Sequence, residues 1–113
     1  MKERVTKRPK VLVMCQGGNS RSVAMGYLLK YKYNFDAIAC SLEKNSEETL
    51  QMLFEWSEKI ILMQGYMMEH VPKEFHNKVI VTDVGEDVWF CIPNYLVSLC
   101  DHTIKEFIPE ILK

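Results

Sequence analysis

The sequence predicts an α/β protein with a three-layer α/β/α architecture built on a four-stranded parallel sheet. Four short apolar runs rich in β-branched residues alternate with stretches of helical periodicity. Strands that alternate with helices favour right-handed βαβ crossovers, which place helices on both faces of a parallel sheet. No internal repeat, low-complexity segment or linker interrupts the 113 residues, so we expect a single domain over 1–113.

The first half of the chain contains two strand patterns, each followed by a helix pattern. Lys10–Cys15 (KVLVMC) is a continuous apolar run, as expected of a strand buried on both faces, and Asp36–Cys40 (DAIAC) is the second candidate. The first strand is followed by a helical stripe of apolar residues: Ala24, Tyr27, Leu28 and Tyr31. After the second strand, Ser46 is a suitable N-cap for a helix whose predicted buried face is Leu50, Leu53 and Phe54.

The second half supplies the other two strands and a long helix. Lys59–Met63 (KIILM) and Lys78–Thr82 (KVIVT) are short β-branched runs, and the piece between them reads as loop and a short helix. The last helix is predicted from a stripe of Leu96, Leu99, Cys100, Thr103, Ile104, Phe107 and Ile111. Pro109 is expected to strain or end its last turn.

Composition excludes several classes of function. The formal net charge is −1, which argues against nucleic-acid or membrane binding, and no run approaches the roughly 20 apolar residues of a membrane span. The four cysteines show neither a CxxC motif nor a disulfide-framework spacing, so we expect free thiols and a cytoplasmic location. Residues 1–9 form a locally basic N-terminal arm, which either meets an acidic partner or is simply solvated.

The chemistry is expected in the loop after the first strand. Ligands of such sheets bind at the carboxyl ends of the strands, near the point where strand order reverses. There Cys15 closes the strand, two glycines follow, and an Arg and a Ser open a helix. The predicted phosphate-binding residues are Gln16, Gly17, Gly18, Asn19, Ser20, Arg21 and Ser22.

Each part of this loop has a physical reason to be there. Glycines let successive backbone N–H groups converge on an anion, and the helix N-terminus adds its positive dipole end. Arg21 can grip two phosphate oxygens with its planar fork, and a thiol among these donors ionises more readily than an ordinary Cys. The Ser22 hydroxyl can donate to the resulting Cys15 thiolate. These groups together suit a nucleophile placed below a bound phosphoryl group.

The motif Cys-(x)5-Arg-Ser directly after VLVMC resembles the phosphate loop of the low-molecular-weight protein tyrosine phosphatases. The stretch LFEWSEKIILM resembles a compact bacterial branch of that family. The resemblance implies the four-stranded parallel sheet and a hydrolase that acts on phosphate monoesters through a phosphocysteine intermediate. Its substrate would be phosphotyrosine in a protein, or a small phosphate ester. Cys15 would be the nucleophile and Arg21 the phosphate-binding cation, with no metal or cofactor.

The sequence departs from the family pattern in three places. The usual Asn three residues after the Cys is Gly18, with Asn19 one later, and Ser20 replaces a second Cys that often precedes the Arg. The D-P-Y signature of the general-acid loop is absent from TDVGEDVWF. Asp87 is the favoured acid, because the aromatic Trp89 follows two residues later and could form the rim of the substrate site. Asp83 and Glu86 are the alternatives.

The remaining cysteines allow two interpretations, and the histidines indicate no metal site. Cys40, Cys91 and Cys100 could be resolving thiols, as in arsenate reductases of this fold, although Cys40 and Cys100 lie on apolar patterns typical of core positions. The three histidines lack metal-ligand spacing, so no metal site is expected.

Two other functions stay open at this point. A phosphocysteine carrier, like the IIB components of sugar phosphotransferase systems, has a similar sheet and a Cys-led loop, but Arg21 is atypical of such loops. A phosphate-binding module without a working acid would also explain the missing D-P-Y. A serine phosphatase of the RNA polymerase C-terminal-domain type ranks lower, because those enzymes are considerably longer.

Overall fold

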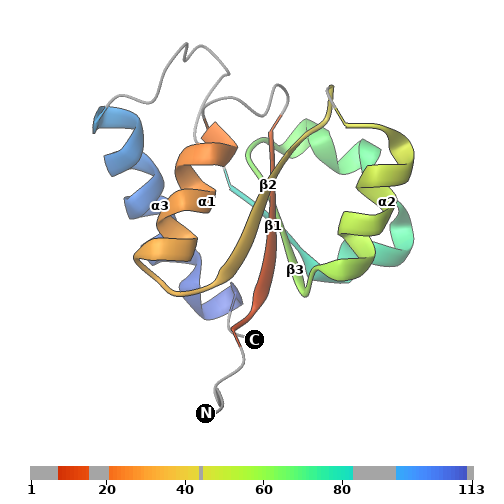
Figure 1. Ribbon diagram of the computed structural model, residues 1–113. Helices are drawn as coiled ribbons and strands as arrows, with labels where there is room; N and C mark the ends of the chain where they lie inside the picture. The colour runs from red at the N-terminus through yellow and green to blue at the C-terminus, as the bar shows by residue number, and fades with distance from the viewer. Residues whose placement is uncertain (1–7, 16–20, 44, 83–93, 112–113) are drawn as a thin grey trace.

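The protein folds around a four-stranded parallel sheet with the strand order β2-β1-β3-β4 (Figure 1). This computed structural model describes residues 8–15, 21–43, 45–82 and 94–111. The strands are β1 (Lys10–Cys15), β2 (Asp36–Ser41), β3 (Lys59–Leu62) and β4 (Val79–Val81). The helices are α1 (Arg21–Tyr31), α2 (Glu47–Trp56) and α3 (Asn94–Ile111), with two 3-10 segments, η1 (Gly65–His70) and η2 (Lys73–Lys78). The predicted fold class and all four strands are confirmed.

The strand order places β1 inside the sheet, between β2 and β3. Cys15 pairs with Ser41 of β2, and Met14 pairs with Leu62 of β3, all in parallel. The chain runs from β1 to β2 on one side and then crosses to β3 on the other, so the strand order reverses at β1. The carboxyl end of β1 is therefore the place where this kind of sheet binds ligands.

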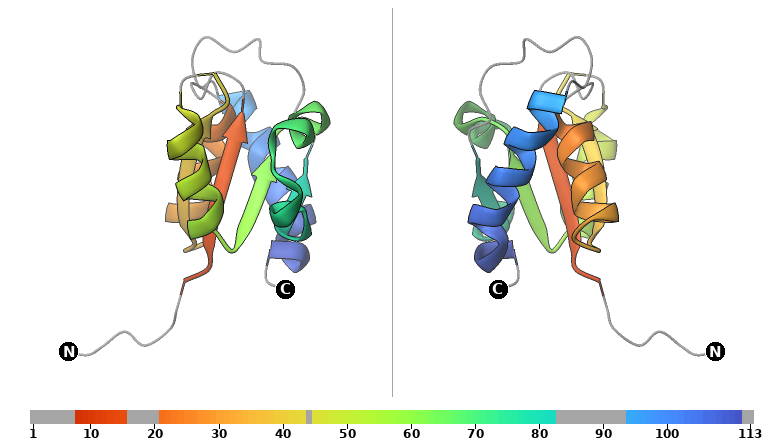
Figure 2. Two further views of the ribbon diagram at one scale, coloured as in Figure 1. Left: turned by 90° about the vertical axis from the view of Figure 1, so that its right-hand side faces the viewer. Right: turned by 90° about the vertical axis from the view of Figure 1, so that its left-hand side faces the viewer.

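Helices cover both faces of the sheet. Helices α1 and α3 pack together on one face, and α2 lies on the other face with η1 and η2 (Figures 1 and 2). Five of the six β1 residues, Val11 to Cys15, have no exposed surface because both layers cover them. This agrees with the continuous apolar run that predicts a strand buried on both faces.

The predicted start and buried face of α2 are confirmed. The Ser46 hydroxyl accepts a hydrogen bond from the Thr49 amide at 3.1 Å, as an N-cap does. Leu50 and Phe54 are buried, and Leu53 is half-buried against the core.

The predicted buried face of α1 is half wrong. Ala24 and Leu28 are buried, but Tyr27 and Tyr31 are 63% and 70% exposed. Their rings pack on each other instead, with centroids 4.9 Å apart. The buried face is shifted toward Met25 and Leu29, which also recur at helical spacing.

The predicted stripe of α3 faces the core. Leu96, Cys100, Thr103, Ile104 and Ile111 are buried, with Leu99 and Phe107 half-buried. The helix continues through Pro109 to Ile111, so of the two expected effects of this proline, strain in the last turn or an end to the helix, the second does not occur.

The described end of the N-terminal arm is tied to the fold. The Arg8 guanidinium donates to three backbone carbonyls that end α1 and form the following turn: Lys30 at 3.2 Å, Asn34 at 3.1 Å and Phe35 at 2.6 Å. Asn34 has the positive φ of 62° that such turns require. A cation at a helix C-terminus is favourable, so Arg8 has a structural role. Residues 1–7 lie outside the described residues.

A polar cluster connects the end of α1 to α3. Asp101 of α3 accepts a hydrogen bond from the Tyr33 hydroxyl at 2.6 Å and pairs with the Lys32 ammonium at 2.9 Å. These two contacts, the Tyr33 hydrogen bond first, lower the pKa of Asp101 to about 2. Burial, together with the bond to Asp101, raises the pKa of Tyr33 to about 12.

We predict an acid-sensitive contribution of Asp101 to stability. A carboxylate whose folded pKa lies below its unfolded value stabilises the protein above that unfolded value, near pH 4. The contribution is then lost as the pH falls from about 4 to about 2. Asp101→Asn should therefore lower the free energy of unfolding by about 1–2 kcal/mol at pH 6, after allowance for solvent screening, and by much less at pH 2.5. Urea unfolding at both pH values measures this difference; an equal deficit at both would contradict the assignment.

Candidate active site

A buried thiol and a buried hydroxyl meet where β1 ends and α1 begins. The Cys15 Sγ lies 3.0 Å from the Ser22 Oγ, and neither residue has exposed surface. Cys15 is the last residue of β1 and Ser22 is the second residue of α1, so the strand end and the first helical turn hold this contact between them. The predicted contact between Cys15 and Ser22 is present in the structure, and the roles of the two residues stay predictions.

The backbone around Cys15 is fixed on both sides. The Cys15 carbonyl accepts the Leu42 amide of the segment after β2 at 2.9 Å. On the other side, the Met14 carbonyl accepts the Met63 amide after β3 at 3.1 Å. The Cys15 thiol is therefore presented by a rigid, central strand, which is the support that a precisely placed reactive group needs.

The two other described cysteines are buried thiols of the core. Cys40 pairs with Met14 in register, one residue before Cys15, so its side chain lies on the opposite face of the sheet from that of Cys15. Burial first, and then the proximity of Cys15, raise the pKa of Cys40 to about 12. A thiol with such a pKa is a poor nucleophile, which argues against Cys40 as a resolving thiol. Cys100 is buried on α3, as expected of a core position.

Comparisons with known proteins identify the architecture. No protein-family model matches the sequence, and no curated protein is significantly similar to it. Among solved structures, Wzb from Vibrio vulnificus in complex with benzylphosphonate has a TM-score of 0.69 at 15% identity, covering 91% of this chain and 99% of its own. The tyrosine phosphatase Wzb from Escherichia coli K30 in complex with phosphate gives 0.67 at 12%, covering 91% and 98%. The YwlE arginine phosphatase from Geobacillus stearothermophilus gives 0.61 at 16%, covering 92% and 96%.

The chain has the low-molecular-weight phosphatase fold. The predicted resemblance to that family is confirmed at the level of the fold. The similarity extends over most of this chain and nearly all of each solved structure, so it covers the whole three-layer arrangement.

Several of the site residues predicted for this chain lie outside the part that the structure describes. The backbone of Arg21 is described: Arg21 is the first residue of α1 and directly precedes Ser22. Residues 16–20, which hold the rest of the predicted phosphate loop, lie outside the described residues. The candidate acids Asp83, Glu86 and Asp87 lie outside them too, as do Trp89 and Cys91. Their assignments stay predictions.

The carboxyl edge of the sheet carries further polar groups that the sequence analysis did not single out. Asn45 closes the turn after β2, since its side-chain oxygen accepts the Ser41 amide at 2.7 Å. Tyr66 follows β3 at the same edge and is 42% exposed. Thr82 is buried after β4, where its hydroxyl donates to the Leu62 carbonyl at 3.1 Å. All three lie within four residues of the end of a parallel strand, and this position was the sequence signal that could have found them.

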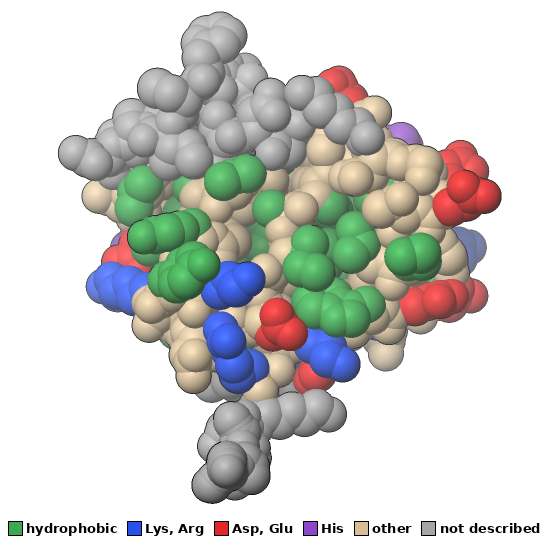
Figure 3. Space-filling view, viewed as in Figure 1, with side chains coloured by type: hydrophobic (Ala, Val, Ile, Leu, Met, Phe, Trp, Pro, Cys, Tyr) green, Lys and Arg blue, Asp and Glu red, His purple; other side chains and the backbone are tan. Residues whose placement is uncertain are grey.

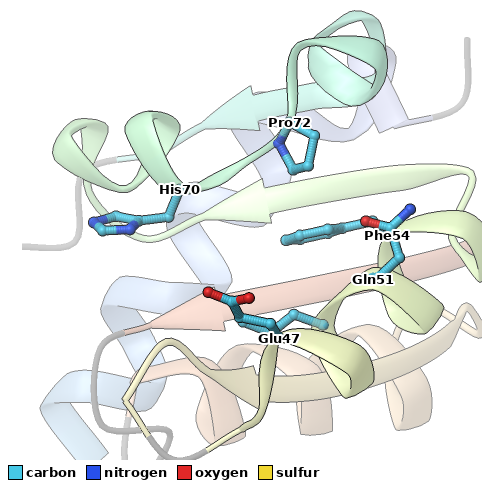
Figure 4. Close-up of a pocket in the computed structure, with 6 residues that line it drawn as sticks. Glu47, Gln51, Phe54, His70 and Pro72 are labelled. Carbon is cyan, nitrogen blue, oxygen red and sulfur yellow. The ribbon is translucent and has the colours of Figure 1, made fainter.

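A groove of about 250 Å³ lies beside this edge, between α2 and the 3-10 segments. Its lining consists of Glu47, Leu50, Gln51, Phe54, His70 and Pro72 (Figure 4). Glu47 and His70 lie at the end of the groove toward which β1 runs. Neither Cys15 nor Ser22 lines it, so the groove is separate from the candidate nucleophile.

In the part of the chain that the structure describes, no cluster of three or more His, Cys, Asp or Glu side chains could hold a metal ion. No described helix has the length and apolar character that crossing a membrane requires.

Proposed function

We propose that the chain is a cysteine-dependent phosphatase that hydrolyses phosphate monoesters, in particular phosphotyrosine in proteins, through a phosphocysteine intermediate. The observation that carries the proposal is the buried contact between the Cys15 Sγ and the Ser22 Oγ, 3.0 Å apart at the carboxyl end of the central strand. The motif Cys-(x)5-Arg-Ser and the low-molecular-weight phosphatase fold both support it.

In the first step, the Cys15 thiolate attacks phosphorus and the bond from phosphorus to the leaving oxygen breaks. A thiolate can only accept hydrogen bonds, so the Ser22 hydroxyl donates to it in this state. Arg21 and backbone amides of residues 16–22 hold the phosphoryl oxygens, whose charge grows in the transition state. An acid of the segment after β4, with Asp87 favoured, protonates the leaving oxygen.

In the second step, water attacks phosphorus and the bond from sulfur to phosphorus breaks. The same acidic residue, now ionised, takes a proton from the water, and inorganic phosphate leaves. The thiolate of Cys15 is regenerated and again accepts the Ser22 hydrogen bond.

The setting that we propose is the cytoplasm, with a phosphorylated protein as partner. Among the described residues, Cys15, Cys40 and Cys100 form no disulfide, which is compatible with a thiol-dependent enzyme. Trp89 is the proposed aromatic rim for a tyrosine ring.

The proposal is tested by hydrolysis of para-nitrophenyl phosphate in EDTA at mildly acidic pH, followed by assays on two peptides, one carrying phosphotyrosine and the other phosphoarginine. Turnover of the ester and of the phosphotyrosine peptide is the expected result. A preference for phosphoarginine, the substrate type named for the YwlE neighbour, would keep the phosphatase and correct the substrate. Stoichiometric phosphorylation of Cys15 without turnover would indicate a carrier, and phosphate binding alone would indicate a binding module.

We predict that Ser22→Ala lowers kcat by about ten- to a hundredfold, the range expected for one lost hydrogen bond to a charged group. Steady-state kinetics with para-nitrophenyl phosphate measure the loss.

Ser57→Ala is the matched control for this prediction. Ser57 is also buried, and its hydroxyl donates to the Phe54 carbonyl at 3.2 Å, but it precedes β3 at the opposite end of the sheet. Ser57→Ala should reduce stability and leave kcat unchanged. If both variants lose activity equally, the Ser22 effect is one of folding.

A further inference from the structure

The groove beside α2 has an apolar floor. Phe54 and Leu50 are 2% and 8% exposed, and Pro72 lies across the groove from Phe54 (Figure 4). The Phe54 ring packs on the Phe75 ring with centroids 5.6 Å apart, which fixes its position. The volume of about 250 Å³ falls below the roughly 300–1,000 Å³ of pockets for drug-sized molecules. The groove therefore has room for a single long side chain rather than for a cofactor.

The rim of the groove is rich in hydrogen-bond acceptors. The Glu47 carboxylate is exposed and has no hydrogen-bond or ion-pair partner among the described residues. Gln51 donates one N–H to the Glu55 carboxylate at 3.0 Å, which leaves its amide oxygen and a second N–H for a ligand. A ligand that meets the Glu47 carboxylate and the Gln51 oxygen must bring donors, and a cation satisfies the carboxylate best.

The α2 side of the groove is acidic. Residues 45–58 contain Glu47, Glu48, Glu55 and Glu58 and no Lys or Arg. Figure 3 shows acidic side chains over α2, on the right-hand side of the molecule. A surface of one sign attracts and orients ligands of the opposite charge.

The groove also opens near the carboxyl edge that holds the candidate nucleophile. Ser41 pairs with Cys15 in register, Asn45 is hydrogen-bonded to Ser41, and Glu47 follows two residues later. These short steps limit the separation of Glu47 from Cys15 to about 18 Å, which an extended peptide spans in about five residues. A side chain within that distance of a phosphorylated residue can reach the groove.

We propose that this groove is a specificity site that binds a lysine or arginine side chain of the phosphorylated protein. The aliphatic stem lies on Leu50, Phe54 and Pro72, and the cationic head meets the Glu47 carboxylate and the Gln51 amide oxygen. Long cationic side chains commonly bury their stems on apolar surface in this way. The inference rests on the proposed phosphatase function and adds a class of substrate sequence to it.

The test uses pairs of phosphotyrosine peptides that differ at one position, within five residues on either side of the phosphotyrosine. One peptide carries lysine there and the other norleucine, which keeps the aliphatic stem and removes the charge. At one position the wild type should show a kcat/KM about fivefold higher for lysine, the size expected for an exposed ion pair. The preference should weaken in 0.5 M salt because the pair is screened.

Two matched variants decide whether the groove is responsible. Glu47→Gln should abolish the preference for lysine, and Glu47→Lys should turn it into a preference for a peptide with glutamate there. Glu48→Gln should leave the preference for lysine intact. Glu48 is the next residue in the first turn of α2 and has the same charge, but it does not line the groove. All these variants should hydrolyse para-nitrophenyl phosphate at the wild-type rate.

Each contrary outcome has a distinct meaning. If the wild type turns over para-nitrophenyl phosphate but shows no lysine preference, the specificity site is wrong and the phosphatase stands. An equal loss in Glu47→Gln and Glu48→Gln would also overturn the site, in favour of a general effect of surface charge. If the wild type hydrolyses no ester, the proposed function fails. The groove is then tested with the unphosphorylated lysine peptide by NMR, where amide shifts at Glu47 and Leu50 support it and their absence overturns it.

Discussion

Cys15→Ser should abolish turnover of phosphotyrosine peptides, with a fall in kcat of about 10⁴-fold or more, the scale typical of lost nucleophiles. A serine hydroxyl at this position stays protonated near neutral pH, whereas a thiol ionises much more readily. The replacement is nearly isosteric and the position is fully buried, so the fold and phosphate binding should survive. Steady-state kinetics give the loss, and isothermal titration with phosphate gives the retained binding.

The control for this variant is Cys40→Ser. Cys40 is also buried, lies in the neighbouring strand and pairs with Met14, but on the opposite face of the sheet. It should lose some stability and no activity. Acid-quenched wild type should carry phosphate on the peptide that contains Cys15. Full activity in Cys15→Ser, or phosphate trapped on another residue, would refute the mechanism.

The sheet could be predicted from sequence because its signals are local. The four strands are continuous apolar runs, and the observed bounds differ from the predicted ones by at most one residue at either end. A strand buried on both faces needs such a run, whatever its partners are. The bounds of the first strand were enough to predict that Cys15 lies at the carboxyl end of β1. They also predicted its contact with Ser22 in the first turn of α1.

Other features depended on contacts that local patterns do not specify. Tyr27 and Tyr31 share the helical spacing of α1 with residues that are buried, and only the packing of α1 on the sheet shows that the tyrosines are exposed. Arg8 belongs to a basic run that reads as a solvated arm, yet it donates to carbonyls 22 to 27 residues away. The groove combines residues of α2 with two residues beyond β3, a juxtaposition that only the crossover creates.

Arg21→Ala should lower kcat/KM for phosphotyrosine peptides by about 10³-fold, the upper range for one lost stabilising group in the transition state. Arg21 is the first residue of α1, and the next residue places its hydroxyl 3.0 Å from the Cys15 sulfur. The backbone of Arg21 is thus held close to Cys15. Its planar guanidinium is the group best suited to bind two oxygens of the phosphoryl group at once. Initial rates at low substrate concentration measure the loss.

Arg21→Lys separates charge from geometry. Lysine keeps the positive charge but presents a point charge on a flexible stem, so it should recover only a small part of the lost rate. Arg8→Ala is the matched control, because the Arg8 guanidinium binds carbonyls at the opposite end of the same helix. It should reduce the free energy of unfolding and leave kcat/KM unchanged. Full activity in Arg21→Lys would mean that charge alone is needed, while equal losses in Arg8→Ala and Arg21→Ala would mean that both residues act through the stability of α1.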